Sequence, residues 1–359
     1  MLANYNLLKI LAIFMVVAVH MLNVVNLVPP GDVRAFHVHE IIRTVLLTSN
    51  GLFFMLSGRF LLEHYDGKIG RFYWKRVVKI GIPVLAASCF YYVYVFGKNG
   101  MDGVFWKNFV KDLMQSHVQG YLWFVYALAG FYLAVPFLSR MFGQMSRREK
   151  AALTGITILY FLVQNLYQIF HLEMVFTSYF LYSWVFYCVL GYLLDSMELS
   201  KKQKNRLILA GLLCFLVSAW EICFWDRENP AIHNYSLTMI SMTMAGYLAV
   251  TTYGKWLAGR LESVVHFVAG RSFWIYLMHG LTQNWIAGWL NGGWLGEGIF
   301  GGSRPWMTGG AAGWGCWFVL SVLSFVMALG IGCLLDAVYK PVSRWLLKMD
   351  FKMFAEKEK

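Results

Sequence analysis

Long apolar runs are the feature of this sequence that most restricts its fold. Blocks of about 20 mainly apolar residues alternate with short charged stretches, and a helix needs about that length to cross a bilayer. With 58% hydrophobic and only 14% charged residues among 359, the chain lies far from the composition of a soluble domain. We therefore expect an all-α fold, a polytopic integral membrane bundle of about ten transmembrane helices. The expected spans cover residues 7–28, 44–62, 77–96, 120–139, 151–170, 175–194, 206–225, 234–253, 264–287 and 312–339.

The connections between these blocks differ in their basic residues. Connections on one side hold 20 Lys and Arg residues, whereas those on the other side hold seven. Because basic loops stay on the cytoplasmic side, we expect both termini to be cytoplasmic. The net charge of +12 follows from these loops, so we assign no nucleic-acid partner. The expected organisation is a transmembrane domain over 1–345 and a short basic cytoplasmic tail over 346–359.

Three further features concern packing and the membrane surface. The six cysteines all fall inside the expected spans without CxxC spacing, which supports neither a disulfide framework nor a metal site. In the segment 102–115, helical spacing places apolar residues on one face and polar residues on the opposite face, as in an interfacial helix. The stretch 288–315 is rich in glycine and contains Trp289, Trp294, Trp306 and Trp314. These tryptophans are interpreted either as an aromatic belt or as residues that stack on a sugar.

The first apolar block contains Lys9 and His20, two side chains that lipid disfavours. The eleven residue steps from Lys9 to His20 return to within about 20° of the same direction, so both side chains lie on one helix face. Asn6 lies close to that face. A charge near the bilayer centre costs roughly 2.5–3.5 kcal/mol, so we expect this face to point to the bundle interior or to a water-filled cavity. A lysine near a helix end can extend to the surface and a single histidine can be only a helix contact, so both roles stay open here.

Two other spans also carry polar faces. Ser272, Tyr276, His279 and Gln283 are three or four residues apart, and therefore share a helix face. Asn50 and Ser57 coincide on the second span in the same way. Because a neutral imidazole can accept a proton near pH 7, His20 is suited to act as a general base.

A basic cluster lies at the expected cytoplasmic end of the third span. It consists of Arg71, Lys75, Arg76 and Lys79. Such a cluster can bind the phosphates of an acyl nucleotide thioester, or it can serve only to fix the membrane topology.

An ordered set of motifs from about residue 4 to about residue 285 resembles the membrane acyltransferase 3 family. Lys9, ten residues and His20 resemble that family's motif of Arg, ten residues and His. The other resembling segments are FFMLSGRFLL (53–62), WKRVVKIGIP (74–83), YLWFVYALAGFYLAVPFL (121–138), YFLYSWVFYCVLGYLL (179–194) and FWIYLMHG (273–280). Within the family, the chain is most similar to the branch with the enterobacterial common antigen O-acetyltransferase and the membrane domain of vancomycin-resistance serine racemases.

This resemblance implies an enzyme of the bacterial cytoplasmic membrane. It would move an acyl group, usually acetyl from acetyl-CoA, to a hydroxyl of a cell-envelope glycan or lipid-linked sugar, without a metal. His20 would be the catalytic base, Lys9 would stand at the Arg position, and Arg76 and Lys79, next to Lys75, would meet the coenzyme. Candidates for contacting the acceptor or the oxyanion are Asn6, Ser57, Tyr121, Trp123, Tyr276 and His279.

The chain departs from the family's pattern at several positions. Lysine at 9 and at 79 replaces a bidentate guanidinium by a point charge, and Asn6 stands where Asp is usual. Tyr121 takes the place of a histidine, and Arg59 follows Ser-Gly where a large apolar residue is common. A protein that exports a glycan or lipid-linked sugar without acyl transfer is therefore the alternative function.

Overall fold

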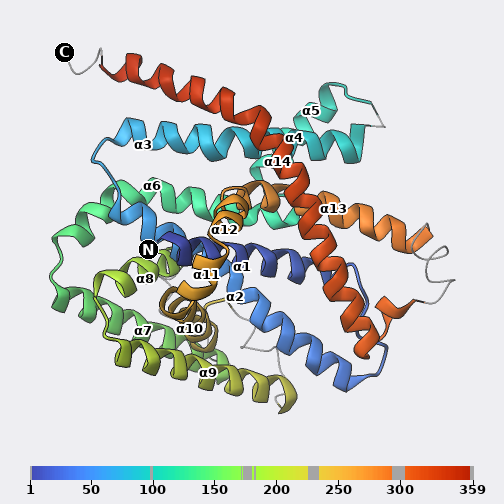
Figure 1. Cartoon of the computed structure of the whole chain (residues 1–359), viewed down its shortest axis with the longest axis horizontal. Helices are drawn as coiled ribbons and strands as arrows, with labels where there is room; N and C mark the ends of the chain where they lie inside the picture. Colours follow the sequence, from blue (N-terminus) through green and yellow to red (C-terminus); the bar gives the residue numbers. More distant parts are fainter. Residues whose placement is uncertain are drawn as a thin grey trace. The chain divides into compact units, whose positions relative to one another are not determined.

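The computed structural model describes residues 2–97, 100–170, 172, 180–181, 183–224, 234–292 and 304–355. Within these ranges the chain forms helices and no strand, which confirms the expected all-α class. The helices divide into two compact units. Figure 1 gives the labels of the helices along the chain.

The first unit consists of Met1–Phe60 and Met145–Cys333. It contains α1 (Leu2–Met21), most of α2 (Val33–Glu63), α7 (Arg147–Ile169), α8 (Trp184–Ser196), α9 (Lys201–Phe224), α10 (Leu237–Tyr253), α11 (Lys255–Arg260), α12 (Glu262–Ala269), α13 (Ser272–Gly292), η6 (Pro305–Met307) and the first half of α14 (Ala311–Ala355). α1 contacts α10, α11, α12 and α13, and α9 packs along α10. The helix that carries Lys9 and His20 is therefore surrounded by other helices of its unit.

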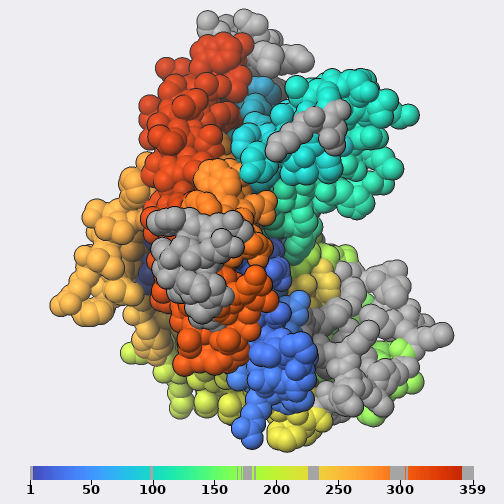
Figure 2. All heavy atoms as spheres, turned by 90° about the vertical axis from the view of Figure 1, so that its right-hand side faces the viewer, coloured from blue at the N-terminus to red at the C-terminus, as the bar shows by residue number. Residues whose placement is uncertain are grey.

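The second unit consists of Leu61–Gln144 and Leu334–Lys359. It contains α3 (Ile69–Arg76), η1 (Val77–Gly81), α4 (Ile82–Phe96), α5 (Gly103–Met114), η3 (Gly120–Leu122), α6 (Trp123–Gln144) and the last part of α14. The red C-terminal part of α14 lies beside the blue α3 in both Figure 1 and Figure 2. Two hydrogen bonds join these parts of the unit, from Trp74 to the carbonyl of Leu346 and from Tyr339 to the carbonyl of Val78.

Six of the described helical segments are long and apolar enough to cross a membrane. They are Ala3–Met21, Val33–Glu63, Ile69–Phe96, Gly120–Gln144, Lys201–Phe224 and Ala311–Met349. The expected spans 151–170, 234–253 and 264–287 correspond to shorter or less apolar helices, and part of the expected span 175–194 lies outside the described residues. For example, the expected span 264–287 is divided between α12 and α13, because α12 ends at Gly270. The expected span 312–339 lies in a helix that continues to Ala355 through Pro341.

Two glycines allow α2 and α8 to touch at their backbones. A Cβ atom added to Gly58 would lie 1.8 Å from the carbonyl oxygen of Cys188, and one added to Gly191 would lie 2.1 Å from that of Met55. Small residues permit such close approach between membrane helices. Gly58 of the segment FFMLSGRFLL and Gly191 of the segment YFLYSWVFYCVLGYLL therefore lie at one helix crossing.

Several helices begin where the sequence provides a cap. Ser146 and Glu149 form reciprocal hydrogen bonds at the start of α7, with the Ser146 N–H donating to Glu149 over 2.7 Å. Ser200 and Gln203 do the same at α9. These capping boxes satisfy N–H groups that lack intrahelical partners.

The predicted helix over 102–115 is confirmed as α5. Asp102 caps it by accepting from the N–H of Phe105 over 2.8 Å. On its apolar face, Phe105 and Phe109 pack on Tyr92, whereas Trp106, Val110 and Met114 are exposed.

The tryptophans of the stretch 288–315 belong largely to the protein interior. Trp306 is 3% exposed and lies in a cluster with Met21 and Leu290, against which Trp289 and Trp314 pack. This arrangement favours packing over sugar stacking for these three residues. Trp294 lies outside the described residues.

Candidate functional site

The expected site residues lie in both units. Asn6, Lys9, His20, Ser57, Tyr276 and His279 belong to the first unit, whereas Lys75, Arg76, Lys79, Tyr121 and Trp123 belong to the second.

His20 lies next to a second histidine, which α13 supplies. The ring centroids of His20 and His279 are 5.2 Å apart, with the ring planes inclined by 43°. His20 is half-buried and His279 is fully buried. His20 therefore faces a buried polar side chain of its own unit, as the helix-face argument predicts.

The hydrogen bond of His279 fixes which of its nitrogens carries a proton. Its Nδ1 lies 2.6 Å from the carbonyl oxygen of Tyr276. Because a carbonyl oxygen can only accept, Nδ1 must donate, and the Nε2 atom of the neutral ring therefore presents its lone pair. His279 can thus act as a hydrogen-bond acceptor beside His20.

The last turns of α1 are fixed to α13 and α14 by hydrogen bonds to α1 carbonyls. Gln283 donates to the carbonyl of Val17 over 2.9 Å, and the Trp317 indole donates to that of Ala18 over 3.0 Å. Thr282 and Ser324 are joined by a buried hydrogen bond of 2.8 Å between α13 and α14. These contacts hold His20 in place between two helices. Gln283 was part of the predicted polar face, and all four members of that face are buried.

Lys9 is half-buried on α1, about 16 Å along the axis from His20 given a rise of 1.5 Å per residue. Among the residues that the structure describes, it makes no ion pair or hydrogen bond. A cation in an apolar setting requires compensation. Lys9 can therefore attract an anion.

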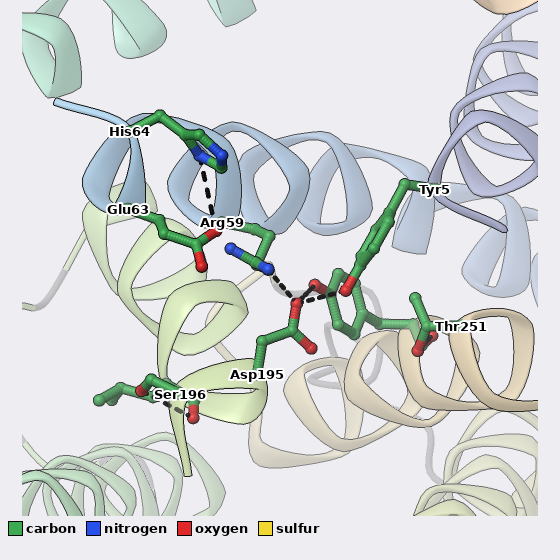
Figure 3. A network of polar contacts seen from close by, with 9 residues as sticks. Tyr5, Arg59, Glu63, His64, Asp195, Ser196 and Thr251 are labelled. Atoms are coloured by element: carbon green, nitrogen blue, oxygen red, sulfur yellow. Dashed lines mark hydrogen bonds and ion pairs between the residues drawn. The ribbon is translucent and has the colours of Figure 1, made fainter. Parts of the chain in front are cut away.

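A polar cluster near the start of α1 was missed by the sequence reading. Arg59 of α2 forms an ion pair with Asp195 of α8, and Tyr5 of α1 donates to the same carboxylate over 2.6 Å. Figure 3 shows these three side chains converging. Tyr247 of α10 donates a further hydrogen bond of 3.0 Å to Asp195. The cluster joins four helices one turn before Lys9. Arg59 lies inside the expected span 44–62 and Asp195 directly follows the expected span 175–194. A charge within a span was the available signal.

We expect Asp195→Asn to lower the free energy of unfolding by about 3 kcal/mol, because it leaves the Arg59 cation without its carboxylate. The two side chains are only 15% and 17% exposed, so water replaces the lost partner poorly. Thermal unfolding of the purified protein in detergent measures the change.

The matched control removes both charges, since an apolar replacement of a buried ion pair is often neutral. Arg59→Met combined with Asp195→Leu should therefore be more stable than Asp195→Asn. Equal stability of Asp195→Asn and the unmodified protein would show that this cluster does not support the fold.

The basic cluster of the second unit lies where α3 meets η1. Lys75 and Arg76 end α3, and Lys79 lies in η1, a π-helical turn. The Arg76 guanidinium carbon is 5.0 Å from the ring centroid of Phe72 and 5.4 Å from that of Tyr132. Two aromatic faces thus orient Arg76, whereas Lys79 is exposed.

The other candidates have more ordinary surroundings. In the second unit Tyr121 is buried against Tyr91 in an edge-to-face contact, and Trp123 is half-buried beside Phe124. In the first unit Asn6 and Ser57 are half-buried. Tyr276 is buried, with its ring 6.0 Å from that of His279.

Comparisons with known proteins give one match. A family model described as an acyltransferase domain matches residues 2–337, a range that includes every candidate site residue. No curated protein and no solved structure matches the chain.

Proposed function

This chain belongs to the acyltransferase 3 family of membrane proteins, and from that premise we propose that it is an O-acetyltransferase of the bacterial cytoplasmic membrane. The proposed reaction moves acetyl from cytoplasmic acetyl-CoA to a hydroxyl of a cell-envelope glycan or lipid-linked sugar. The observation that carries this proposal is the contact between His20 and the buried His279. This contact supports His20 as a base with a fixed orientation, because the neighbouring acceptor nitrogen of His279 can orient the His20 ring.

In the proposed mechanism, a ring nitrogen of His20 takes the proton of the acceptor hydroxyl while the hydroxyl oxygen attacks the thioester carbonyl. The tetrahedral intermediate then loses the thiolate as its carbon–sulfur bond breaks. The thiolate takes the proton from His20, which returns the imidazole to its neutral state. The products are the acetyl ester and free coenzyme A, so protons and acyl groups balance.

The phosphates of the donor are assigned to the basic cluster of the second unit. Arg76 has a fork of donors for a phosphate, and its guanidinium is already oriented by Phe72 and Tyr132. Lys75 and Lys79 would add positive charge. Lys9 is proposed as a further cation for the donor, since it makes no ion pair with a described residue.

The acceptor and the oxyanion are assigned to polar groups of the candidate set. Hydroxyl and amide donors stabilise a developing oxyanion when they are held in place. The candidates of the first unit are Asn6, Ser57, Tyr276 and His279, and those of the second unit are Tyr121 and Trp123.

Acetyl-CoA should stabilise the purified protein against heat. A ligand that binds only the folded state adds RT ln(1 + [L]/Kd), which is about 2.7 kcal/mol at 100 times its Kd. We expect the unfolding temperature to rise with acetyl-CoA and to saturate.

The matched control ligand is the acetyl thioester of N-acetylcysteamine, which has the reacting group but no phosphate. It should shift the unfolding temperature much less than acetyl-CoA at the same concentration. Equal shifts would contradict phosphate binding by the basic cluster. No shift with acetyl-CoA at high concentration would contradict the proposed donor and favour the exporter.

A further inference from the structure

The π-helical turn η1 separates α3 from α4 in the segment that holds the basic cluster. The N–H of Ile82, the first residue of α4, donates to the carbonyl of Val77, five residues earlier. This spacing is that of a π-helix, whereas an α-helix bonds four residues back. Such turns are rare and occur often at functional sites.

Pro83 leaves one carbonyl of this turn without its regular donor. Continuing the five-residue spacing by one position pairs the carbonyl of Val78 with the nitrogen of residue 83. Residue 83 is proline, which has no N–H. Val78 is fully buried, and an unpaired buried carbonyl is costly. The turn therefore requires a donor from another part of the chain.

Tyr339 of α14 provides that donor. Its hydroxyl donates to the carbonyl of Val78 over 2.5 Å, across 261 residues of sequence and within the second unit. The hydroxyl thus replaces the missing N–H of Pro83.

We propose that Tyr339 is a positioning residue for the basic cluster, an inference that rests on the proposed function. By satisfying the Val78 carbonyl, Tyr339 stabilises the π-helical turn between Arg76 and Lys79. The wider turn changes the rotation about the helix axis between these two residues, and therefore the direction in which Lys79 leaves the helix. Because Arg76 is held separately by Phe72 and Tyr132, the turn determines how the two cations are placed for a phosphate-bearing donor.

The test is Tyr339→Phe in the full-length protein, with acetyl-CoA as the probe. The variant keeps the ring and removes only the hydroxyl. We expect the acetyl-CoA concentration that gives half of the maximal thermal shift to rise about tenfold. In an acetyl-transfer assay, KM for acetyl-CoA should rise while kcat changes little, which a general loss of stability would not produce.

The matched control is Trp74→Phe, which removes another hydrogen bond to α14, from the indole of Trp74 in α3 to the carbonyl of Leu346 (3.2 Å). It should lower the unfolding temperature without changing the half-saturating acetyl-CoA concentration. The inference is overturned if Tyr339→Phe binds acetyl-CoA as the unmodified protein does, or if Trp74→Phe weakens binding equally. If acetyl-CoA fails to stabilise even the unmodified protein, the proposed function and this inference both fail.

Discussion

Replacing His20 with alanine should reduce acetyl transfer by about 10²- to 10⁴-fold, the range attributed to a positioned general base. The acceptor hydroxyl would then have to lose its proton to water while it attacks the thioester. His279 should not replace it as the base, because the ring of His279 is fully buried whereas that of His20 is half-buried.

The loss should occur without unfolding. His20 is half-buried near the end of α1, and the nearby hydrogen bonds from Gln283 and Trp317 go to backbone carbonyls that alanine leaves unchanged. The unfolding temperature and the thermal shift with acetyl-CoA should therefore stay close to those of the unmodified protein.

The activity is measured in membrane preparations as the transfer of labelled acetyl from acetyl-CoA to envelope glycans or lipid-linked sugars. His266→Ala is the matched control, since His266 is an exposed histidine of α12 in the same unit. It should retain full activity. An active His20→Ala variant would refute the proposed mechanism, whereas an inactive His266→Ala variant would show that the assay responds to any histidine loss.

The environment of α1 could be predicted because a helix converts spacing into direction. The separation of Lys9 and His20 places both on one face, and the spacing of Ser272, Tyr276 and His279 does the same for α13, where all three are buried. Residue spacing within a helix does not indicate which faces of different helices contact each other. The contact between His20 and His279 joins two helices that are far apart in sequence.

The cluster around Asp195 was missed because a charge at or near the end of an apolar run is usually solvated. Arg59 was noted only as a departure from the family's pattern. Its partner Asp195 lies 136 positions later, at the end of α8. Arg59 lies three residues before the end of the expected span 44–62 and Asp195 directly follows the expected span 175–194, so neither position by itself indicates that the two charges form a pair.

The number of membrane spans could not be predicted reliably for a different reason. An apolar run predicts burial and length, but not where a helix breaks inside the run, and Gly270 divides one expected span between α12 and α13. The π-helical turn was equally hidden, because it depends on a hydroxyl from Tyr339, on another helix. From the sequence, Pro83 indicates only that the regular hydrogen bonding of a helix is interrupted nearby.

A second large effect is expected at the crossing of α2 and α8. Gly58→Val should prevent the first unit from folding stably, since its side chain would occupy the space of the Cys188 backbone. Even the Cβ atom alone would lie 1.8 Å from the carbonyl oxygen and 2.3 Å from the carbonyl carbon. Both are backbone atoms, so no side-chain rotation relieves the clash and the helices must separate.

Gly58→Ala is the milder variant of the same change. Overpacking commonly costs about 1–3 kcal/mol, and more when the backbone must move, so we expect at least about 3 kcal/mol here. Separation of the helices would also pull Arg59, the next residue, away from Asp195. The loss should therefore exceed that of a simple steric clash.

The control is Gly155→Ala on α7, in the same unit, where an added Cβ meets nothing within 4 Å. Alanine there should be neutral or stabilising by up to about 1 kcal/mol, because it favours the helix over glycine. The unfolding temperature and the folded fraction on size-exclusion chromatography in detergent compare the variants. If Gly58→Ala is as stable as Gly155→Ala, the two helix backbones do not pack this closely, and the structural reason given for the Ser-Gly segment is wrong.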